Sequence, residues 1–373
     1  MPFLDSALNW ITLLVILVVL VVIHELGHFI VARRAHVRVH EFGIGFPPRA
    51  KILARDKETI YTLNWLPIGG FVRLEGEEGE SEDPRAFVNQ PLRTRLTILV
   101  AGVFMNFILA WLIFGGIAAV ADPVTNIELG CVQPGSPAEQ IGLVGGKVVA
   151  TDANGNSTCD YTGDTILAIN GQRFPSFDDI TSGDAPVKAL SAHAGQTVTL
   201  TIRHAGGTVE DKTATLRVPT PGQGALGISS FALTRSDQIQ QPPLDAVATG
   251  LRRTLTASTL ILSGLRDLVT NITHPTVSGP VGIVGAVGVV RSELPPVFLF
   301  WLIGMLSANL AIVNVLPIPP MDGGRIAVSI IQRLSGNRIS VAFERAVYLV
   351  GFLALMALLV WITWFDIQRS AGG

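Results

Sequence analysis

Four long apolar stretches limit what this chain can fold into. A helix needs about 20 residues to cross the hydrocarbon core of a bilayer. Four stretches reach that length, namely Ser6 to about Ala32, Leu96 to Val120, Val297 to Leu316 and Ala346 to Phe365. Charged residues make up 15% of the 373 residues, against ~25% in soluble proteins. The first stretch differs from a signal peptide because Asp5 precedes it and its apolar run is longer. The sequence therefore predicts a polytopic α-helical membrane protein with four transmembrane helices.

Basic residues near the ends of these stretches predict the orientation of the chain, because short loops rich in Lys and Arg stay in the cytoplasm. They cluster in two loops, as Arg33, Arg34, Arg38, Arg85, Arg93 and Arg95 in one and Arg325, Arg333, Arg338 and Arg345 in the other. Residues 1–8 and 121–146 contain none. We therefore expect both termini and the segment 121–296 to be extracytoplasmic, in a protein of the inner or cytoplasmic cell membrane.

The loops between the spans carry structure of their own. Residues 37–74 combine β-branched and aromatic residues with Gly and Pro, which predicts a small β-sheet at the cytoplasmic face of the membrane. Short strand-like runs from about 124 to 218 predict a compact β-rich domain outside. Residues 244–272 favour an amphipathic helix at the membrane surface. The uncharged, Gly-rich segment 276–290 is too short for a span, so we expect a re-entrant or surface segment.

The motif HELGH, with His24, Glu25 and His28, lies inside the first apolar stretch. Residues i and i+4 of a helix share a face, so both imidazoles can bind one zinc ion while Glu25 reaches the metal-bound water as general base. A charged group inside a span costs ~2.5–3.5 kcal/mol even on a lenient scale, and ionisable residues there are usually functional. The alternative is a pair of histidines satisfied by helix packing.

A catalytic zinc ion needs a third protein ligand and an open position for water. Residues 314–324 follow the third stretch and combine three prolines and two glycines with one acidic residue, Asp322. The prolines end the helix and the glycines allow tight turns, although a capping aspartate at a Pro-rich helix end is the simpler alternative. His24, His28 and Asp322 are all expected near the cytoplasmic ends of their spans, so one zinc ion at one depth can bind all three.

Taken together, these motifs resemble the site-two protease family of intramembrane zinc metalloproteases, and more closely its bacterial regulator-of-sigma-E protease branch. The resemblance covers nearly the whole chain. It rests on HELGH at 24–28, PIGGFVRLEGE at 67–77, QPLRTRLTILVAGVFMNF at 90–107, the external PDZ-like sequence, SGPVGI at 278–283 and NVLPIPPMDGG at 314–324. It implies that zinc is the cofactor and that His24, His28 and Asp322 are its ligands, with Glu25 as the catalytic glutamate.

The resemblance also implies helper roles for Asn106 and Asn314. Either amide is a candidate to hydrogen-bond the substrate backbone or the oxyanion, the alternative being an interhelical polar contact. A substrate helix must unwind before cleavage, and the edge of the 37–74 sheet offers an extended strand a place to join. That sheet could also be a purely structural hairpin.

The activity that the resemblance implies is hydrolysis of peptide bonds within or near the transmembrane segments of single-span membrane proteins. Substrates of the family include anti-sigma factors and signal-peptide remnants, trimmed first by an upstream site-one protease. The fold expected is four transmembrane helices with a small cytoplasmic-face β-sheet and an extracytoplasmic PDZ-like α+β domain. The expected regions are helix 1 at 1–35, the β-region at 36–95, helix 2 at 96–121, the PDZ-like domain at 122–235, the amphipathic and Gly-rich segment at 236–296, helix 3 at 297–324, and a loop, helix 4 and tail at 325–373.

The chain departs from the family pattern at three points. Val103 stands where many relatives have Pro, and only one PDZ-like domain is evident. An insertion at about 145–162 interrupts the PDZ-like pattern, which leaves peptide binding by that domain open. Cys131 and Cys159 both lie in this external region, where a disulfide that pins the insertion and two free thiols are equally compatible with the sequence.

Two other functions use similar features. A proteolytically inactive PDZ scaffold needs none of the four polar site residues, and a metal-ion transporter also places His and Asp in its spans, although repeats typical of transporters are not visible here. A nucleic-acid partner is not expected, because 27 basic residues face 29 acidic ones.

Overall fold

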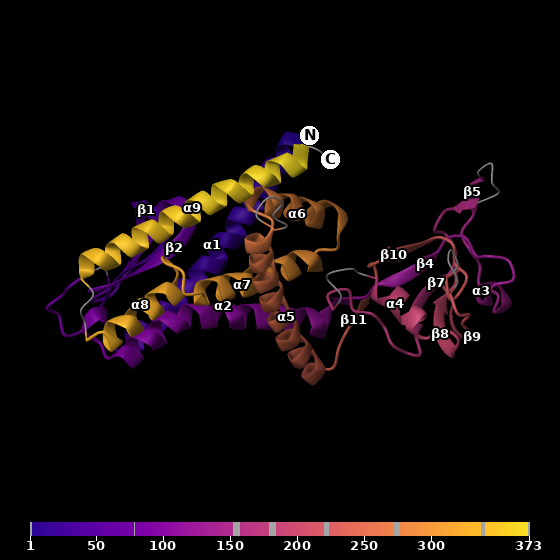
Figure 1. Ribbon diagram of the computed structural model, residues 1–373, viewed down its shortest axis with the longest axis horizontal. Coiled ribbons are helices and arrows are strands. Elements are labelled where there is room, and N and C mark those ends of the chain that lie inside the picture. Colours follow the sequence, from indigo (N-terminus) through magenta and orange to yellow (C-terminus); the bar gives the residue numbers. More distant parts are fainter. Residues whose placement is uncertain are drawn as a thin grey trace. The chain divides into compact units, whose positions relative to one another are not determined.

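The computed structural model describes residues 2–77, 79–151, 157–178, 184–219, 224–271, 277–336 and 340–371. It divides into two compact units, which we call the helical unit (1–116 and 247–373) and the β unit (117–246). Figure 1 labels their elements. Residues 152–156 of the expected insertion, and Thr276 at the start of the expected re-entrant segment, lie outside the described residues.

Among the residues that the structure describes, four helices are long and apolar enough to cross a membrane. They are α1 (Pro2–Arg34), α2 (Leu92–Val120), α7 (Val297–Val315) and α9 (Val341–Ala371). Only 17% of the apolar window of α1 and 6% of that of α9 is buried within the protein. Because a soluble fold would cover such surfaces, the four helices confirm the prediction of a polytopic membrane protein.

The expected sheet consists of two long strands, β1 (Val39–Arg55) and β2 (Ile60–Leu74), which pair with each other in three places. Residues 39–44 pair antiparallel with 70–74, residues 49–55 pair antiparallel with 60–64, and residues 41–46 run parallel to 60–66. The order of the paired segments across the sheet is 70–74, 39–46, 60–64 and 49–55. The chain reverses direction at Pro47 and Pro48 within β1, because the pairing with β2 is parallel up to Phe46 and antiparallel from Arg49 onward. Residues 70–74, which we call the edge segment, therefore form one edge of the sheet.

This sheet is positioned by α1. Phe42, Val72 and Leu74 are buried in a common cluster with Ala32, and Phe29 of α1 lies edge-on against Phe42 at a ring distance of 5.3 Å. Aromatic and branched side chains therefore hold the edge segment beside the turn of α1 that carries HELGH.

Three further helices belong wholly or mainly to the helical unit. α5 (Pro243–Thr270) packs on α2, where a Cβ on Gly250 would lie 2.7 Å from the backbone nitrogen of Gly115. α6 (Pro280–Glu293) has 14 residues, too few to span, and its Gly282 N–H donates to Asp366 of α9 at 2.8 Å. α8 (Asp322–Leu334) is a helix where a loop was expected.

The β unit contains a five-stranded antiparallel sheet with the order β10-β4-β7-β8-β9. Its strands are β4 (Asn126–Leu129), β7 (Thr165–Ile169), β8 (Thr197–Arg203), β9 (Val209–Thr215) and β10 (Phe231–Thr234). Val198, Leu200 and Ile202 alternate into the core, as period-2 sequence dictates. Two short helices, α3 (Pro137–Gln140) and α4 (Ala185–Ala192), add Ala138 and Leu190 to that core.

The expected insertion contains a small hairpin, in which β5 (Val148–Thr151) pairs with β6 (Ser157–Cys159). A disulfide joins Cys131 to Cys159, so the insertion is pinned to the chain that follows β4. At the two ends of the unit, β3 (Asp122–Pro123) pairs with β11 (Gln238–Ile239). Because β11 follows residue 235, the unit extends past the expected end of the domain.

Candidate metal centre

Two glycines bring α1 and α2 into close contact at the HELGH turn. A Cβ on Gly27 would lie 2.3 Å from the carbonyl oxygen of Ala101, and one on Gly102 would lie 2.4 Å from His28 Nε2 and 2.8 Å from His24 Cε1. Only glycine fits at either position. The backbone of α2 therefore forms a wall directly against both imidazoles.

Asp322 reaches the same point from the other end of the sequence. α7 ends at Val315, and α8 begins at Asp322 after the Pro-rich turn. A Cβ on Gly323 would lie 2.1 Å from the carbonyl oxygen of Val315, and one on Gly324 would lie 2.8 Å from that of Ile318. The two glycines thus let α8 fold back tightly on the end of α7, which presents Asp322 to α1.

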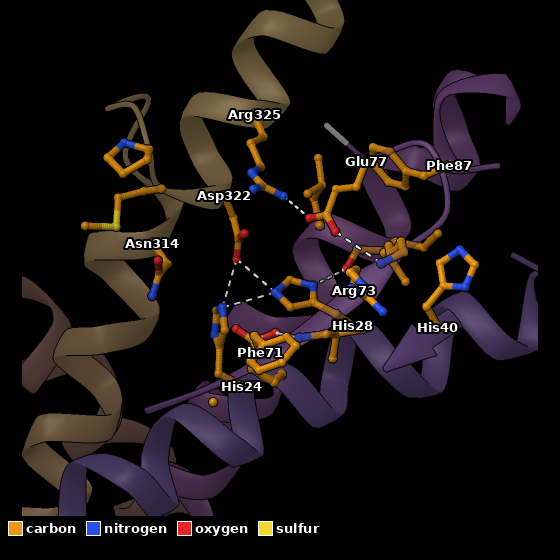
Figure 2. A pocket seen from close by; sticks show the side chains of 18 of the residues that line it. His24, His28, His40, Phe71, Arg73, Glu77, Phe87, Asn314, Asp322 and Arg325 are labelled. Atoms are coloured by element: carbon orange, nitrogen blue, oxygen red, sulfur yellow. Dashed lines mark hydrogen bonds and ion pairs between the residues drawn. The ribbon is translucent and has the colours of Figure 1, made fainter. Parts of the chain in front are cut away.

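Three potential ligand atoms form a nearly equilateral triangle. Asp322 Oδ2 lies 3.0 Å from His24 Nε2 and 3.2 Å from His28 Nε2, and the two nitrogens are 3.1 Å apart. Figure 2 shows the three side chains converging from α1 and α8. Around a tetrahedral zinc ion with bonds of ~2.0–2.1 Å, ligand atoms stand ~3.3 Å apart. The spacing and the donor types therefore suit zinc.

The hydrogen bonds around the triangle support the same conclusion. His28 Nδ1 donates to the carbonyl oxygen of Ile98 at 2.8 Å, and in the neutral ring this bond leaves the lone pair of Nε2 facing the other two atoms. His24 and His28 are only 6% and 8% exposed. Converging lone pairs out of contact with water are unfavourable, and a bound cation satisfies all three at once.

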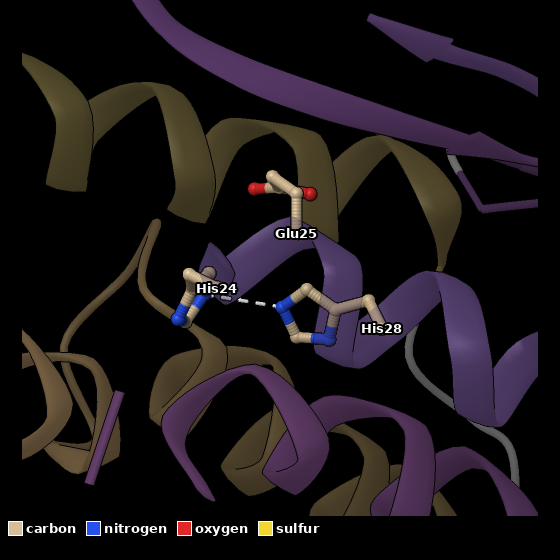
Figure 3. Close-up of side chains that lie close together, drawn as sticks. All are labelled: His24, Glu25 and His28. Carbon is tan, nitrogen blue, oxygen red and sulfur yellow. Dashed lines mark hydrogen bonds between the residues drawn. The ribbon is translucent and has the colours of Figure 1, made fainter. Parts of the chain in front are cut away.

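Glu25 lies beside this triangle and belongs to another face of α1. Figure 3 shows its carboxylate on a different side of the helix from both imidazoles, although the ligand-type atoms of His24, Glu25 and His28 all lie within 4.8 Å of one another. Glu25 Oε2 accepts a hydrogen bond from the backbone N–H of Val72 at 3.1 Å. The carboxylate therefore stands between the triangle and the edge segment.

The triangle opens into a cavity of about 920 Å³. Its walls are the HELGH turn, the edge segment, the loop after β2, the end of α7 and the start of α8. Asn314 lines it and donates to the carbonyl oxygen of Leu310 at 2.9 Å. Asn106 is fully buried instead, with its Nδ2 3.4 Å from His24 Nδ1. The two asparagines singled out in the sequence thus occupy different positions, one in the cavity and one behind a candidate ligand.

An ion pair connects the candidate ligand helix to the loop after the edge segment. Arg325, three residues after Asp322, pairs with Glu77, whose other carboxylate oxygen accepts from the Leu74 N–H at 3.3 Å. Burial opposes the charge on Arg325, but the pairing with Glu77 raises its pKa above the ordinary value, so the guanidinium stays charged. Nearby, hydrogen bonds from Ser81 and His40 lower the pKa of Glu75.

Several of these residues were not identified from the sequence. Arg325 was noted only as a basic residue that marks a loop, and Glu77 only as part of a family-like segment. Gly27 and Gly102 carry no chemical signal of their own, because their role depends on where two helices cross.

Comparisons with known proteins agree with this geometry. The sequence profile described as peptidase family M50 matches residues 12–358. A putative zinc metalloprotease of Clostridium perfringens is 34% identical, with 93% of this chain and 95% of that protein covered. A putative zinc metalloprotease of Clostridium acetobutylicum is 31% identical, with 94% of each covered. The regulator of sigma-W protease RasP of Bacillus subtilis is 28% identical, with 96% of this chain and 98% of that protein covered.

Proposed function

Because the chain belongs to peptidase family M50, we propose that His24, His28 and Asp322 hold the catalytic zinc ion of an intramembrane protease and that Glu25 is its general base. Its relatives are zinc metalloproteases, among them a regulator of sigma-W protease, and this chain is a zinc-dependent metalloprotease of the site-two type. The observation that carries the residue assignment is the triangle of ligand atoms 3.0–3.2 Å apart.

The chemistry divides between the metal and the chain. A bound zinc ion lowers the pKa of water toward ~7 and polarises the scissile carbonyl. Glu25 accepts the proton of the attacking water and passes it to the leaving amide nitrogen. Asn314, which lines the cavity, donates from its amide to the substrate backbone or the developing oxyanion.

The edge segment is the proposed docking place for the substrate. A transmembrane helix hides its peptide bonds, so the scissile region must become extended and must find new hydrogen-bond partners. Residues 70–74 lie along the cavity and pair on one side with β1. A substrate strand that adds to the other side satisfies its backbone groups and brings its carbonyl carbons beside Glu25.

The substrates proposed are single-span membrane proteins, anti-sigma factors above all, after an upstream site-one protease has removed their outer part. The name of the Bacillus subtilis relative supports this class. We place both termini and the β unit outside the cytoplasm, and the edge segment and the metal centre near the cytoplasmic face, in the cell membrane. The β unit, with its antiparallel sheet and two short helices, is proposed to be PDZ-like.

The decisive test is the variant Glu25→Gln. It keeps the size of the side chain and both histidines but removes the proton acceptor, so zinc should remain bound while turnover falls by ~10²–10⁴-fold. Cleavage of a single-span substrate in liposomes and the zinc content are measured on the same samples. Glu82→Gln, which changes an exposed carboxylate of the loop after β2, serves as the matched control.

Near-native cleavage by zinc-loaded Glu25→Gln protein would refute the role of Glu25. If the native protein cleaved no substrate of a broad panel, the inactive scaffold would become the better explanation.

A further inference from the structure

Both ring nitrogens of His24 need a partner if Nε2 binds a metal ion. A neutral imidazole carries one proton, so a ring that ligates through Nε2 carries it on Nδ1 and must donate it. In metal centres this second N–H is normally given to a carboxylate, a carbonyl or water, which fixes the ring and raises its basicity. His28 already shows this arrangement with the carbonyl of Ile98.

The corresponding partner of His24 is Asn106. Its amide lies 3.4 Å from His24 Nδ1 through the nitrogen Nδ2, and two donors cannot bond each other. The amide oxygen Oδ1 is buried and has no hydrogen-bond partner among the residues described. A half-turn of the amide about the Cβ–Cγ bond exchanges the two atoms within the same volume, and it places an acceptor where the Nδ1 proton needs one.

Asn106 is held in a fixed position by the residues around it. The residue is 0% exposed, and Ser307 of α7 donates to its backbone carbonyl at 2.8 Å. It lies one helical turn after Gly102, whose missing side chain lets α2 approach both imidazoles. α1, α2 and α7 thus meet at this amide, away from the cavity that Asn314 lines.

We propose that Asn106 is a positioning residue, whose amide oxygen accepts the Nδ1 proton of His24 and thereby sets that ring to ligate zinc through Nε2. This inference rests on the proposed zinc site and separates the two asparagines. Asn106 acts through His24, whereas Asn314 faces the substrate. The bond to a metal-bound, partly positive imidazole is charge-assisted, which offsets the unpaired amide NH₂ that the half-turn leaves behind.

The test compares Asn106→Leu with Asn106→Asp by their zinc affinity, measured by competition with a chelator on purified full-length protein. Leucine has the same branched framework of heavy atoms as asparagine but no acceptor, so zinc affinity should fall ~10- to 100-fold. Aspartate keeps an acceptor oxygen, so its affinity should equal or exceed that of the native protein. Cobalt substituted for zinc should show an altered visible spectrum in Asn106→Leu and a native-like one in Asn106→Asp.

Asn314→Leu is the matched control, since it should lose turnover while its zinc affinity stays native. Native zinc affinity in folded Asn106→Leu would overturn the proposal. So would a clear loss of zinc affinity in folded Asn106→Asp, which would assign the role to the NH₂ group, and this second outcome can be read even if the leucine variant folds poorly. A failure of the proposed protease function is distinct, because it would appear as missing cleavage by native protein that binds zinc normally.

Discussion

At the scale of single residues, the candidate metal centre depends on glycines that leave room for the ligands as much as on the ligands themselves. Gly102 stands where a methyl group would lie 2.4 Å from His28 Nε2. The ring cannot move without losing its bond to Ile98 and its place in the triangle. The position therefore tests the geometry of the site without touching any ligand.

We expect Gly102→Ala to lower zinc affinity by at least the ~10- to 100-fold that the loss of an outer-shell contact causes, and cleavage should fall with it. Gly116→Ala is the control on the same helix, because a Cβ there meets nothing within 4 Å. Alanine favours a helix by up to ~1 kcal/mol over glycine, so the control should be native-like in zinc binding and no less stable. Equal zinc affinities in the two variants would contradict the close approach.

The sequence points to the candidate ligands and general base more directly than to the residues around them. His24, Glu25 and His28 are inferred from ligand spacing and from their cost inside a membrane, and Asp322 from its place at the end of the third span. Arg325, Glu77 and Val72 take part through contacts between segments far apart in the chain, and no local pattern encodes such contacts. Whether Asn106 and Asn314 lie in the cavity also depends on how α2 and α7 rotate about their axes.

At the scale of elements, the length of the apolar stretches predicted the four long helices, but it could not predict α8 or the mixed parallel and antiparallel pairing of β1 and β2. α8 is not predicted, because its basic residues are also typical of a cytoplasmic loop. The sheet was predicted, but its strand order was not, since residues 39–46 pair with a different part of β2 on each side and no local pattern encodes such pairings.

An ion-paired histidine gives the β unit a pH-dependent element. His204 Nε2 lies 2.8 Å from Glu210 and its Nδ1 2.9 Å from the buried Asp164. Hydrogen bonds to Glu210 and then Asp164 raise the pKa of His204. The stability that these bonds contribute is fully present below the unfolded pKa of ~6.5 and is lost as pH rises through the higher folded pKa.

The β unit should therefore resist unfolding better at pH 6 than at pH 9, and His204→Gln should remove part of that difference. Limited proteolysis of the full-length protein during a thermal ramp, with cuts mapped to 117–246, measures it. His193→Gln is the control, because the side chain of His193, just after α4, bonds only the carbonyl oxygen of Ala189 among the contacts described. An unchanged pH dependence in His204→Gln would exclude this ion-pair cluster as the source.

At the scale of the whole molecule, the basic residues and the four spans together predict one topology. Both termini and the β unit should be extracytoplasmic, and the loop after β2 should be cytoplasmic. Cys131 and Cys159 are joined in a disulfide, so they do not compete with an introduced thiol for a labelling reagent.

Single cysteines at Ser6, Glu82 and Ser229, all exposed, should respond differently to a reagent that cannot cross the membrane. In intact cells with an accessible outer face, Ser6→Cys and Ser229→Cys should be labelled, and Glu82→Cys only after the membrane is opened. Labelling of Ser229→Cys only from the inside would reverse the proposed orientation and, with it, the side on which substrates are trimmed.

The edge segment has a further consequence for the resting protein. Two of its backbone N–H groups, those of Val72 and Leu74, are occupied by the carboxylates of Glu25 and Glu77. Uncovered strand edges invite indiscriminate pairing with other chains, so the two glutamates act as a competitive cover. A substrate strand that docks as proposed would have to replace both with its own carbonyl oxygens, and in doing so it would release Glu25 from the sheet. Latency and activation would then be two outcomes of one competition for the same pair of hydrogen-bond donors.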